Sequence, residues 1–148
     1  MEAIKEIPMT AGQQRWLGKG LLEGFFSKLD RKVLAKVLKF MVLADFKKGA
    51  VVCQEGERGE AFYLIYRGKV KVSKKGWDDH PTLGTGDYFG EMSLLSGQAR
   101  TATVVVQETS KLFVLKASDF KDMLDKNPAA ARGVEKIAAD RRRELASH

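Results

Sequence analysis

The sequence predicts an α+β protein: a β-roll or jelly-roll of about eight antiparallel strands, with N-terminal helices, one short helix within the strand region and two C-terminal helices. Three observations predict this class. Apolar residues recur at helical spacing up to residue 40, short runs of β-branched and aromatic residues separated by glycine follow, and helical spacing returns after residue 118. The strands should therefore form the middle of the domain, with helices before and after them.

The N-terminal part is predicted to be mainly helical. Residues 1–20 are expected to be an extension or connector, and residues 21–148 the domain. Proline and several glycines argue against one long helix in the extension, so we expect only a short helix around residues 13–17. Residues 21–40 are predicted to be helical, with Asp30 capping a second helix whose apolar residues face a core and whose lysines face solvent.

The middle of the chain is predicted to consist of short strands and glycine turns. The expected strands are residues 42–46, 51–54, 62–66, 70–73, 101–107 and 111–115. Arg67 to Lys69 is expected to be a turn between two of them. Residues 74–81 form a polar loop that holds Trp77 and has no role that the sequence assigns. Cys53, in an apolar run, is expected to be a buried packing residue.

Two helices are predicted after the strands. Ser118 should cap a helix over residues 119–126, and Asn127-Pro128 should end it, because the residue before a proline is disfavoured in helical conformation. A final helix is expected over residues 129–146. Its apolar stripe includes Arg141, whose stem could lie on the core while its head group stays in water, or whose guanidinium could cover a planar ligand.

Composition limits the classes of protein. The chain has 148 residues with 44% hydrophobic and 30% charged residues and a formal net charge of +7, and one cysteine excludes an internal disulfide. Neither a membrane-spanning run nor a signal-peptide core is evident, so we expect a location in the cytoplasm or in the cytoplasmic part of a membrane protein. The positive charge favours anionic ligands, but we expect the domain by itself to bind neither nucleic acid nor membrane.

Residues 83–103 combine closely spaced glycines with one guanidinium group. The glycines, which permit backbone conformations that a side chain would disfavour, are Gly84, Gly86 and Gly90. Residues 91–95 can form a short helix whose unpaired N–H groups favour an anion. Arg100 offers a charged fork that matches a phosphate, and Glu91 can accept hydrogen bonds from hydroxyl groups. The segment therefore predicts a pocket for a small molecule with one phosphate and a sugar hydroxyl.

The run FGEMSLLSGQARTATV, residues 89–104, resembles the phosphate-binding cassette of cyclic nucleotide-binding domains. That family includes the catabolite activator protein, protein kinase A regulatory subunits and cyclic-nucleotide-regulated channels. Residue type, order and spacing agree with the family pattern from Phe89 to Leu95 and again from Arg100 to Thr103. The resemblance implies a β-roll with flanking helices and a cyclic nucleotide as ligand, and in layout it extends over residues 21–146.

The resemblance implies partners for the phosphate and the ribose. The phosphate would be held by Arg100 together with backbone amides of the cassette, from Gly90 through Met92 to Ser93. The alternative for Arg100 is a surface ion pair with Glu91 or Glu108. Glu91 would accept the ribose 2′-hydroxyl, and as a first-turn glutamate it would also favour the helix dipole.

The resemblance also implies contacts to the base. Val72 and Leu83 would line the base and sugar pocket, although core packing suits them equally, and Phe89 opens the cassette. Thr101 would contact the phosphate or the amino group of a guanine, so cyclic GMP is an alternative ligand. Cyclic AMP is the expected one, because it is the commoner ligand of bacterial members of the family. A simple strand position is its alternative role. Arg141 matches a final-helix arginine that lies over the base in bacterial channel domains.

The expected function is a regulatory sensor in which the C-terminal helix closes when the ligand binds. We expect no catalytic residues, no metal site and no cofactor, because His80 and His148 have no partners at ligand spacing and the serines of the cassette have no nearby base. The partner of the sensor would be an effector domain, another protein or a second copy in a homodimer. The alternative function is an interaction or dimerisation module of the same fold that binds no nucleotide.

Overall fold

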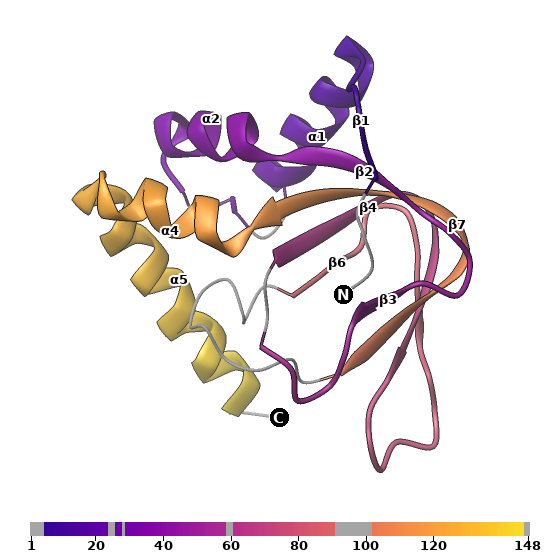
Figure 1. Ribbon diagram of the computed structural model, residues 1–148. Helices are drawn as coiled ribbons and strands as arrows, with labels where there is room; N and C mark the ends of the chain where they lie inside the picture. The colour runs from indigo at the N-terminus through magenta and orange to yellow at the C-terminus, as the bar shows by residue number, and fades with distance from the viewer. Residues whose placement is uncertain (1–4, 24–25, 28, 59–60, 91–101, 147–148) are drawn as a thin grey trace.

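The computed structural model describes residues 5–23, 26–27, 29–58, 61–90 and 102–146 of the chain (Figure 1). The strands in this part of the chain are β1 (Lys5–Ile7), β2 (Val42–Phe46), β3 (Val51–Cys53), β4 (Ala61–Ser73), β5 (Thr82–Leu83), β6 (Tyr88–Phe89) and β7 (Thr103–Lys116). The helices are α1 (Ala11–Glu23), α2 (Arg31–Phe40), α4 (Ala117–Asp125) and α5 (Pro128–Ala146). This arrangement confirms the predicted α+β class. The expected short helix after residue 90 lies outside the described residues.

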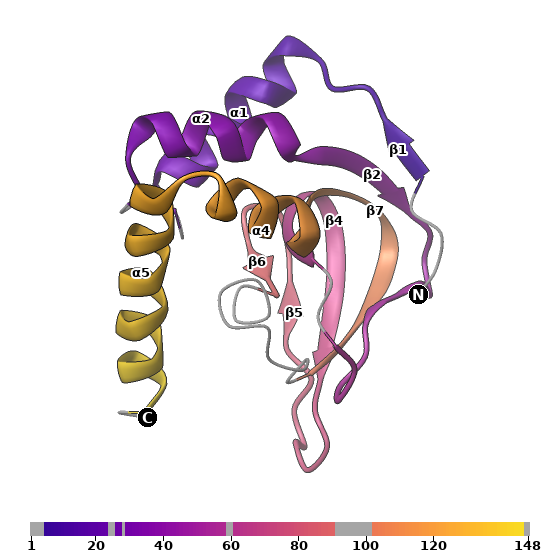
Figure 2. The same ribbon diagram turned by 60° about the vertical axis from the view of Figure 1, so that its left-hand side comes forward.

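The strands form one antiparallel sheet in the order β1-β2-β7-β4-β5, with β3 paired to β7 and β6 paired to β4. The long strands β4 and β7 pair along almost their whole length, and both curve strongly (Figure 2). Their first and second halves therefore belong to different layers of the roll. The layer next to the helices contains β2 and β6, and the other contains β3 and β5.

The bend of the roll lies at a bulge in β4, and the turn predicted at Arg67 to Lys69 is wrong. The pairing of β4 with β7 shifts register between Ile65 and Val70, and Gly68 there has a φ of 110°. A Cβ atom at Gly68 would lie 2.0 Å from the Oγ of Ser110, which is 1% exposed. The glycine thus lets two strand backbones approach closely, so the chain bends without leaving the sheet. The partner strand β7 also continues through the bend, so the two strands expected between residues 101 and 115 are one strand.

Alternation along the strands produces two apolar clusters, one on each face of the sheet. In β4, Phe62 and Leu64 belong to the cluster under the helices, whereas Tyr63 and Ile65 belong to the cluster inside the roll. The inner cluster also contains Cys53, which is 5% exposed, as the sequence predicted. Both faces of the sheet therefore carry apolar side chains, one under the helices and one inside the roll.

The helix α1 is longer than the expected helix at residues 13–17 and runs through Gly18 and Gly20. Thr10 and Gln13 form a capping box at its start, with the Thr10 N–H donating to Gln13 Oε1 at 2.8 Å and the Gln13 N–H to Thr10 Oγ1 at 3.1 Å. A Cβ atom at Gly20 would lie 3.7 Å from Leu64, an ordinary contact distance, so α1 packs against the sheet at this position. The boundary at residue 21 stays a prediction, although α1 spans it.

The remaining helices begin at local caps, with one exception. Asp30 caps α2, as predicted, by accepting a 2.7 Å hydrogen bond from the Lys32 N–H, although α2 begins only at Arg31 and residues 26–27 form a turn. Asn127 accepts a hydrogen bond from the Ala130 N–H and starts α5, so the predicted break at Asn127-Pro128 is confirmed. Ser118 does not cap α4: the cap is Lys116, which makes no side-chain cap bond.

Candidate functional site

The structure describes some of the predicted ligand-binding residues and not others. Four of the predicted residues are fully described: Val72, Leu83, Phe89 and Gly90. The predicted residues outside the described part of the chain are Glu91, Met92, Ser93, Arg100 and Thr101. Arg141 lies in α5, where the structure describes its backbone and not its side chain.

The structure brings Val72 and Leu83 together on adjacent strands. Leu83 of β5 pairs with Val70 of β4, and Val72, two residues further along, shares the face of Val70. The hydrogen bond from the Val72 N–H to the Pro81 carbonyl, 2.8 Å, continues the pairing. Both predicted side chains are half-buried and pack against the inner cluster. They form an apolar wall of the kind that a flat base or a sugar ring can contact.

The first end of the cassette is fixed by an aromatic contact. Phe89 is 7% exposed and stacks on Tyr63 with ring centroids 4.9 Å apart. Gly90 follows with a φ of 87°, a conformation that glycine adopts and other residues rarely do. The strand β6 therefore ends at the first residue of the cassette motif, and the second residue has a backbone angle that favours glycine.

The turn between β5 and β6 is held by its own backbone and by β4. The Asp87 N–H donates to the Gly84 carbonyl at 3.0 Å, and the Gly84 N–H donates to Asp87 Oδ2 at 2.8 Å. Gly86 has a φ of 90°, and its N–H donates to the Ile65 carbonyl at 2.8 Å. Two of the three glycines singled out in the sequence, Gly86 and Gly90, thus occupy positions that require glycine-like backbone angles.

The other end of the cassette is held by Thr103, which belongs to the motif but whose hydrogen bond the sequence did not predict. Thr103, the first residue of β7, accepts a 3.0 Å hydrogen bond through Oγ1 from the Glu55 N–H. The Glu55 carboxylate in turn accepts a 3.1 Å bond from the Lys75 N–H, in the loop that holds Trp77. These long-range bonds tie the β3–β4 and β4–β5 loops to the start of β7. No local sequence signal could have identified them.

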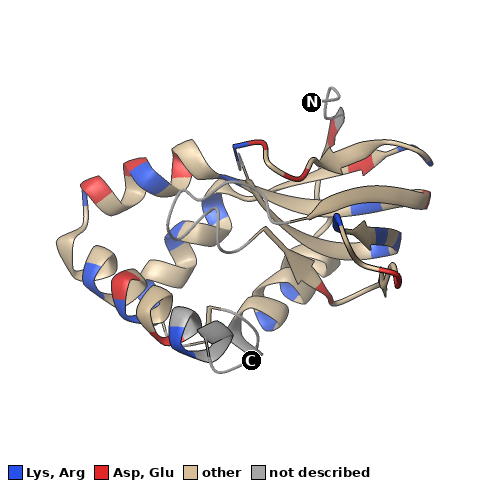
Figure 3. Cartoon of the chain, turned by 90° about the horizontal axis from the view of Figure 1, so that it is seen from below, with Lys and Arg blue, Asp and Glu red and all other residues tan. Residues whose placement is uncertain are grey.

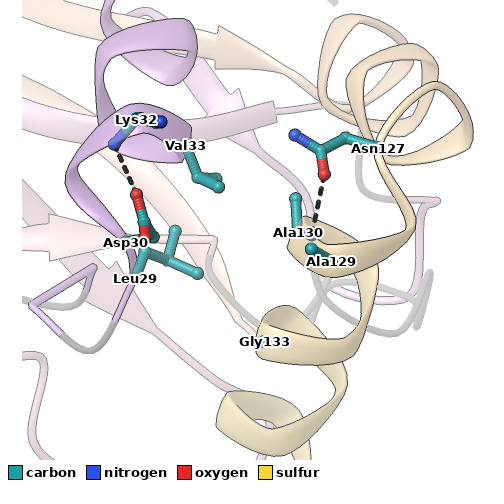
Figure 4. Close-up of a pocket in the computed structure, with 8 residues that line it drawn as sticks. All are labelled: Leu29, Asp30, Lys32, Val33, Asn127, Ala129, Ala130 and Gly133. Carbon is teal, nitrogen blue, oxygen red and sulfur yellow. Dashed lines mark hydrogen bonds between the residues drawn. The ribbon is translucent and has the colours of Figure 1, made fainter.

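A cavity of about 320 Å³ opens between the first turns of α2 and α5, away from these residues (Figure 4). Its lining is Leu29, Asp30, Lys32, Val33, Asn127, Ala129, Ala130 and Gly133. Figure 4 shows the two capping side chains, Asp30 and Asn127, on opposite sides of it. Of the predicted ligand-binding residues that the structure describes, none lines this cavity, which marks the junction of the two helices.

Two further observations concern other kinds of function. Within the described ranges, no group of three or more His, Cys, Asp or Glu side chains is arranged to hold a metal ion. No helix in the same part of the chain is both long enough and apolar enough to span a bilayer.

Comparison with known proteins identifies the family. The family model of the cyclic nucleotide-binding domain matches residues 43–127. A cyclic nucleotide-gated potassium channel of Rhizobium etli is 36% identical over 118 residues, which are 79% of this chain and 32% of the channel. The cAMP-dependent protein kinase regulatory subunit of Schizosaccharomyces pombe is 31% identical over 140 residues, covering 88% of this chain and 34% of the subunit.

A solved structure shares the fold. The structure of cAMP-bound PfPKA-R superposes with a TM-score of 0.70 at 21% sequence identity, covering 82% of this chain and 47% of that one. The chain therefore belongs to the cyclic nucleotide-binding domain family, as the cassette motif predicted. It spans about a third of the length of the two curated relatives, which are a channel and a kinase regulator. The matched family is a binding domain, and none of these relatives indicates an enzyme family.

Proposed function

We propose that this chain binds a cyclic nucleotide monophosphate and acts as a regulatory sensor. The observation that carries the proposal is the match of residues 43–127 to the cyclic nucleotide-binding domain, because that span includes the whole cassette motif. The geometry at both ends of the cassette supports it. Gly90, the second residue of the motif, has a positive φ that favours glycine, and Thr103, near its end, is held by a hydrogen bond from the Glu55 N–H.

Each part of the ligand has a proposed partner. Arg100 and the amides of residues 90–93 hold the cyclic phosphate, and Glu91 accepts the ribose 2′-hydroxyl. Val72 and Leu83 contact the base and sugar, a role supported by their shared half-buried face. The role of Arg141 over the base follows the family resemblance.

Cyclic AMP is the proposed ligand, with cyclic GMP also accepted. Support for cyclic AMP comes from the kinase regulatory subunit of S. pombe, which is cAMP-dependent by name, and from the cAMP-bound state of the structural relative. Thr101 supports cyclic GMP as a second ligand, because its hydroxyl could reach a guanine amino group. A titration of both nucleotides against the same preparation measures the preference directly.

The proposed signal is closure of α5 on the bound ligand. The first half of α5 is anchored, since Ala130, Val134 and Ile137 are all less than 10% exposed and belong to the cluster under the helices. Figures 1 and 2 both show the helix continuing down beside the roll. A ligand that contacts both the roll and α5 would favour one position of this helix. Amide hydrogen exchange over residues 129–146 should slow on adding ligand, and unchanged exchange would contradict closure.

We also propose which kind of protein responds to ligand binding. Since the chain spans about a third of a channel and of a kinase regulator, we propose that it serves as the cytoplasmic sensor of an effector, joined in the same protein or as a partner. In the first case residues 1–20 would be the connector.

The test of the binding function is calorimetric titration of the wild-type chain and of Arg100→Glu. Loss of a charge-assisted phosphate contact, together with like-charge repulsion, should weaken cyclic AMP binding by roughly a hundredfold or more. Lys121→Glu makes the same charge change on an exposed position of α4 and should bind like the wild type. Equal affinity of Arg100→Glu and the wild type would refute the assigned role.

A second titration isolates the ribose contact. The 2′-deoxy analogue of cyclic AMP should bind markedly less tightly to the wild type, because Glu91 would lose its hydroxyl partner. It should bind Glu91→Gln with a smaller relative loss. Absence of any cyclic nucleotide binding by the folded wild type would leave the interaction or dimerisation module as the function.

A further inference from the structure

The exposed face of α2 carries basic residues and one aromatic ring. Its members, here called the α2 face, are Arg31, Lys32, Lys36, Lys39 and Phe40, and all five are exposed. Lys32, Lys36 and Lys39 follow one another at spacings of four and three residues and therefore form a single stripe. The opposite face, with Val33, Leu34 and Val37, is buried in the core. The helix is thus fixed in place with its basic side outward.

The charges in the first half of α2 oppose the stability of the helix, whereas Lys39, in the last turn, is favoured by the helix dipole. The first turn of α2 contains two basic and no acidic residues, although the positive end of the helix dipole favours acidic ones. Lys32 and Lys36 are like charges four residues apart, which repel each other. The nearby carboxylate of Asp30 is engaged with the Lys32 backbone N–H. Among the residues that the structure describes, no ion pair joins any of the four cations.

The helices α4 and α5 do not share this pattern, whereas α1 carries two exposed basic residues, Arg15 and Lys19, and its one acidic residue is at its C-terminal end. The helix α4 combines three aspartates with a single lysine, and α5 mixes Glu135 and Asp140 with its basic residues. With basic residues blue and acidic residues red, α2 is therefore marked in blue alone, whereas α4 and α5 carry both colours (Figure 3). The basic residues of α2 lie on one rigid face, although the helix dipole disfavours those in its first turn and like charges repel one another. Such a surface indicates an anionic partner.

Phe40 narrows the kind of partner. It is 40% exposed, one of three large apolar side chains that the described part of the chain exposes to this degree, and it directly follows Lys39. Lysine is depleted in protein–protein interfaces, and a single ring gives too little apolar area for the core of one. A phosphate backbone would use the lysines but not the ring. Lysines beside one aromatic residue on an amphipathic helix fit the boundary between anionic headgroups and acyl chains.

We propose that the α2 face docks the domain on an anionic lipid surface, with the basic side chains at the headgroups and Phe40 at the acyl boundary. The overall composition did not predict membrane contact; the placement of charge on α2 points to it. The helix is already formed and packed, so binding requires no folding. The attraction should weaken as salt rises, because the pairs form at an exposed surface.

The test is co-sedimentation of the full chain with vesicles at low salt. Vesicles of phosphatidylcholine containing about 30% phosphatidylserine should bind the wild type, and vesicles of phosphatidylcholine alone should not. Each basic residue near such a surface contributes about fivefold, so Lys36→Gln with Lys39→Gln should weaken partitioning about 25-fold. The control, Lys121→Gln with Lys136→Gln, changes net charge equally at exposed positions of α4 and α5 and should lose less than about twofold.

Three results would overturn the proposal. The first is no binding of the folded wild type to the anionic vesicles. The second is an equal loss in both double variants, which would assign the attraction to net charge alone. The third is binding to a polyglutamate peptide or a DNA duplex in place of the vesicles, which would assign the α2 face to that class of partner. The circular dichroism spectrum of each variant shows that α2 has not been lost.

Discussion

Replacing Gly68 with alanine tests the structural basis of the roll, because this glycine sits where β4 and β7 bend together. Its φ of 110° is unfavourable for alanine by about 1–2 kcal/mol. The new Cβ would lie 2.8 Å from the Cα and 2.6 Å from the Cβ of Ser110, so backbone must move, at a further cost of about 1–3 kcal/mol. The expected total is about 2–5 kcal/mol, which lowers Tm by roughly 5–15 °C for a chain of this size.

The assay is thermal and denaturant unfolding of three matched variants. Gly49→Ala has the same kind of backbone strain, with φ 91°, but its Cβ would meet no atom within 4 Å. It should therefore cost only about 1–2 kcal/mol. Adding Ser110→Gly to Gly68→Ala removes the obstructing side chain and should recover part of the loss. If Gly68→Ala were no less stable than Gly49→Ala, the close approach of the two strands would be refuted.

Two further substitutions test contacts elsewhere in the fold. Gly133→Ala in α5 should raise stability by about 0.5–1 kcal/mol in chemical unfolding, because alanine favours the helix and its Cβ would lie 3.6 Å from Leu29, an ordinary contact; a fall in stability would contradict the described packing of α5. Thr103→Val removes the acceptor of the Glu55 N–H and should cost about 1 kcal/mol in unfolding while weakening cyclic AMP binding several-fold. Thr103→Ser keeps the acceptor and should restore both, whereas identical loss in Thr103→Ser and Thr103→Val would show that the hydrogen bond is not responsible.

The parts of the fold that the sequence predicted depend on signals between near neighbours. The strand at residues 42–46 and the caps of Asp30 and Asn127 are each specified by residues within one turn or one strand. The apolar stripe of the final helix was predicted in the same way. The spacing of apolar residues predicts the strand and the helical stripe, and one capping side chain predicts the start of each of the two helices.

The features that the sequence did not predict depend on contacts between distant residues. A glycine between two strand-like runs, such as Gly68, usually indicates a turn. Only the close approach of Gly68 to Ser110 shows that the strand continues. Gly18 and Gly20 weaken a helix in isolation, yet α1 continues through both and buries Leu17 and Leu21 in the core. The strand β1 exists because β2 offers it a pairing edge. Tertiary packing overrides local preference in all three cases.

The candidate site shows the same division. The cassette could be recognised because its residues follow one another within one short run, and the structure adds the fixed position of Phe89 on Tyr63. The hydrogen bonds from Lys75 to Glu55 and from Glu55 to Thr103 join residues far apart in the chain, so no local pattern could predict them.

Cyclic nucleotide binding itself is tested most directly by calorimetric titration of the wild-type chain with cyclic AMP, using linear 5′-AMP as the matched control. We expect saturable binding of one cyclic AMP per chain and much weaker binding of 5′-AMP, whose phosphate is not cyclised. Failure of a folded, monodisperse preparation to bind cyclic AMP or cyclic GMP at millimolar concentration, or equal binding of 5′-AMP, would contradict this expectation.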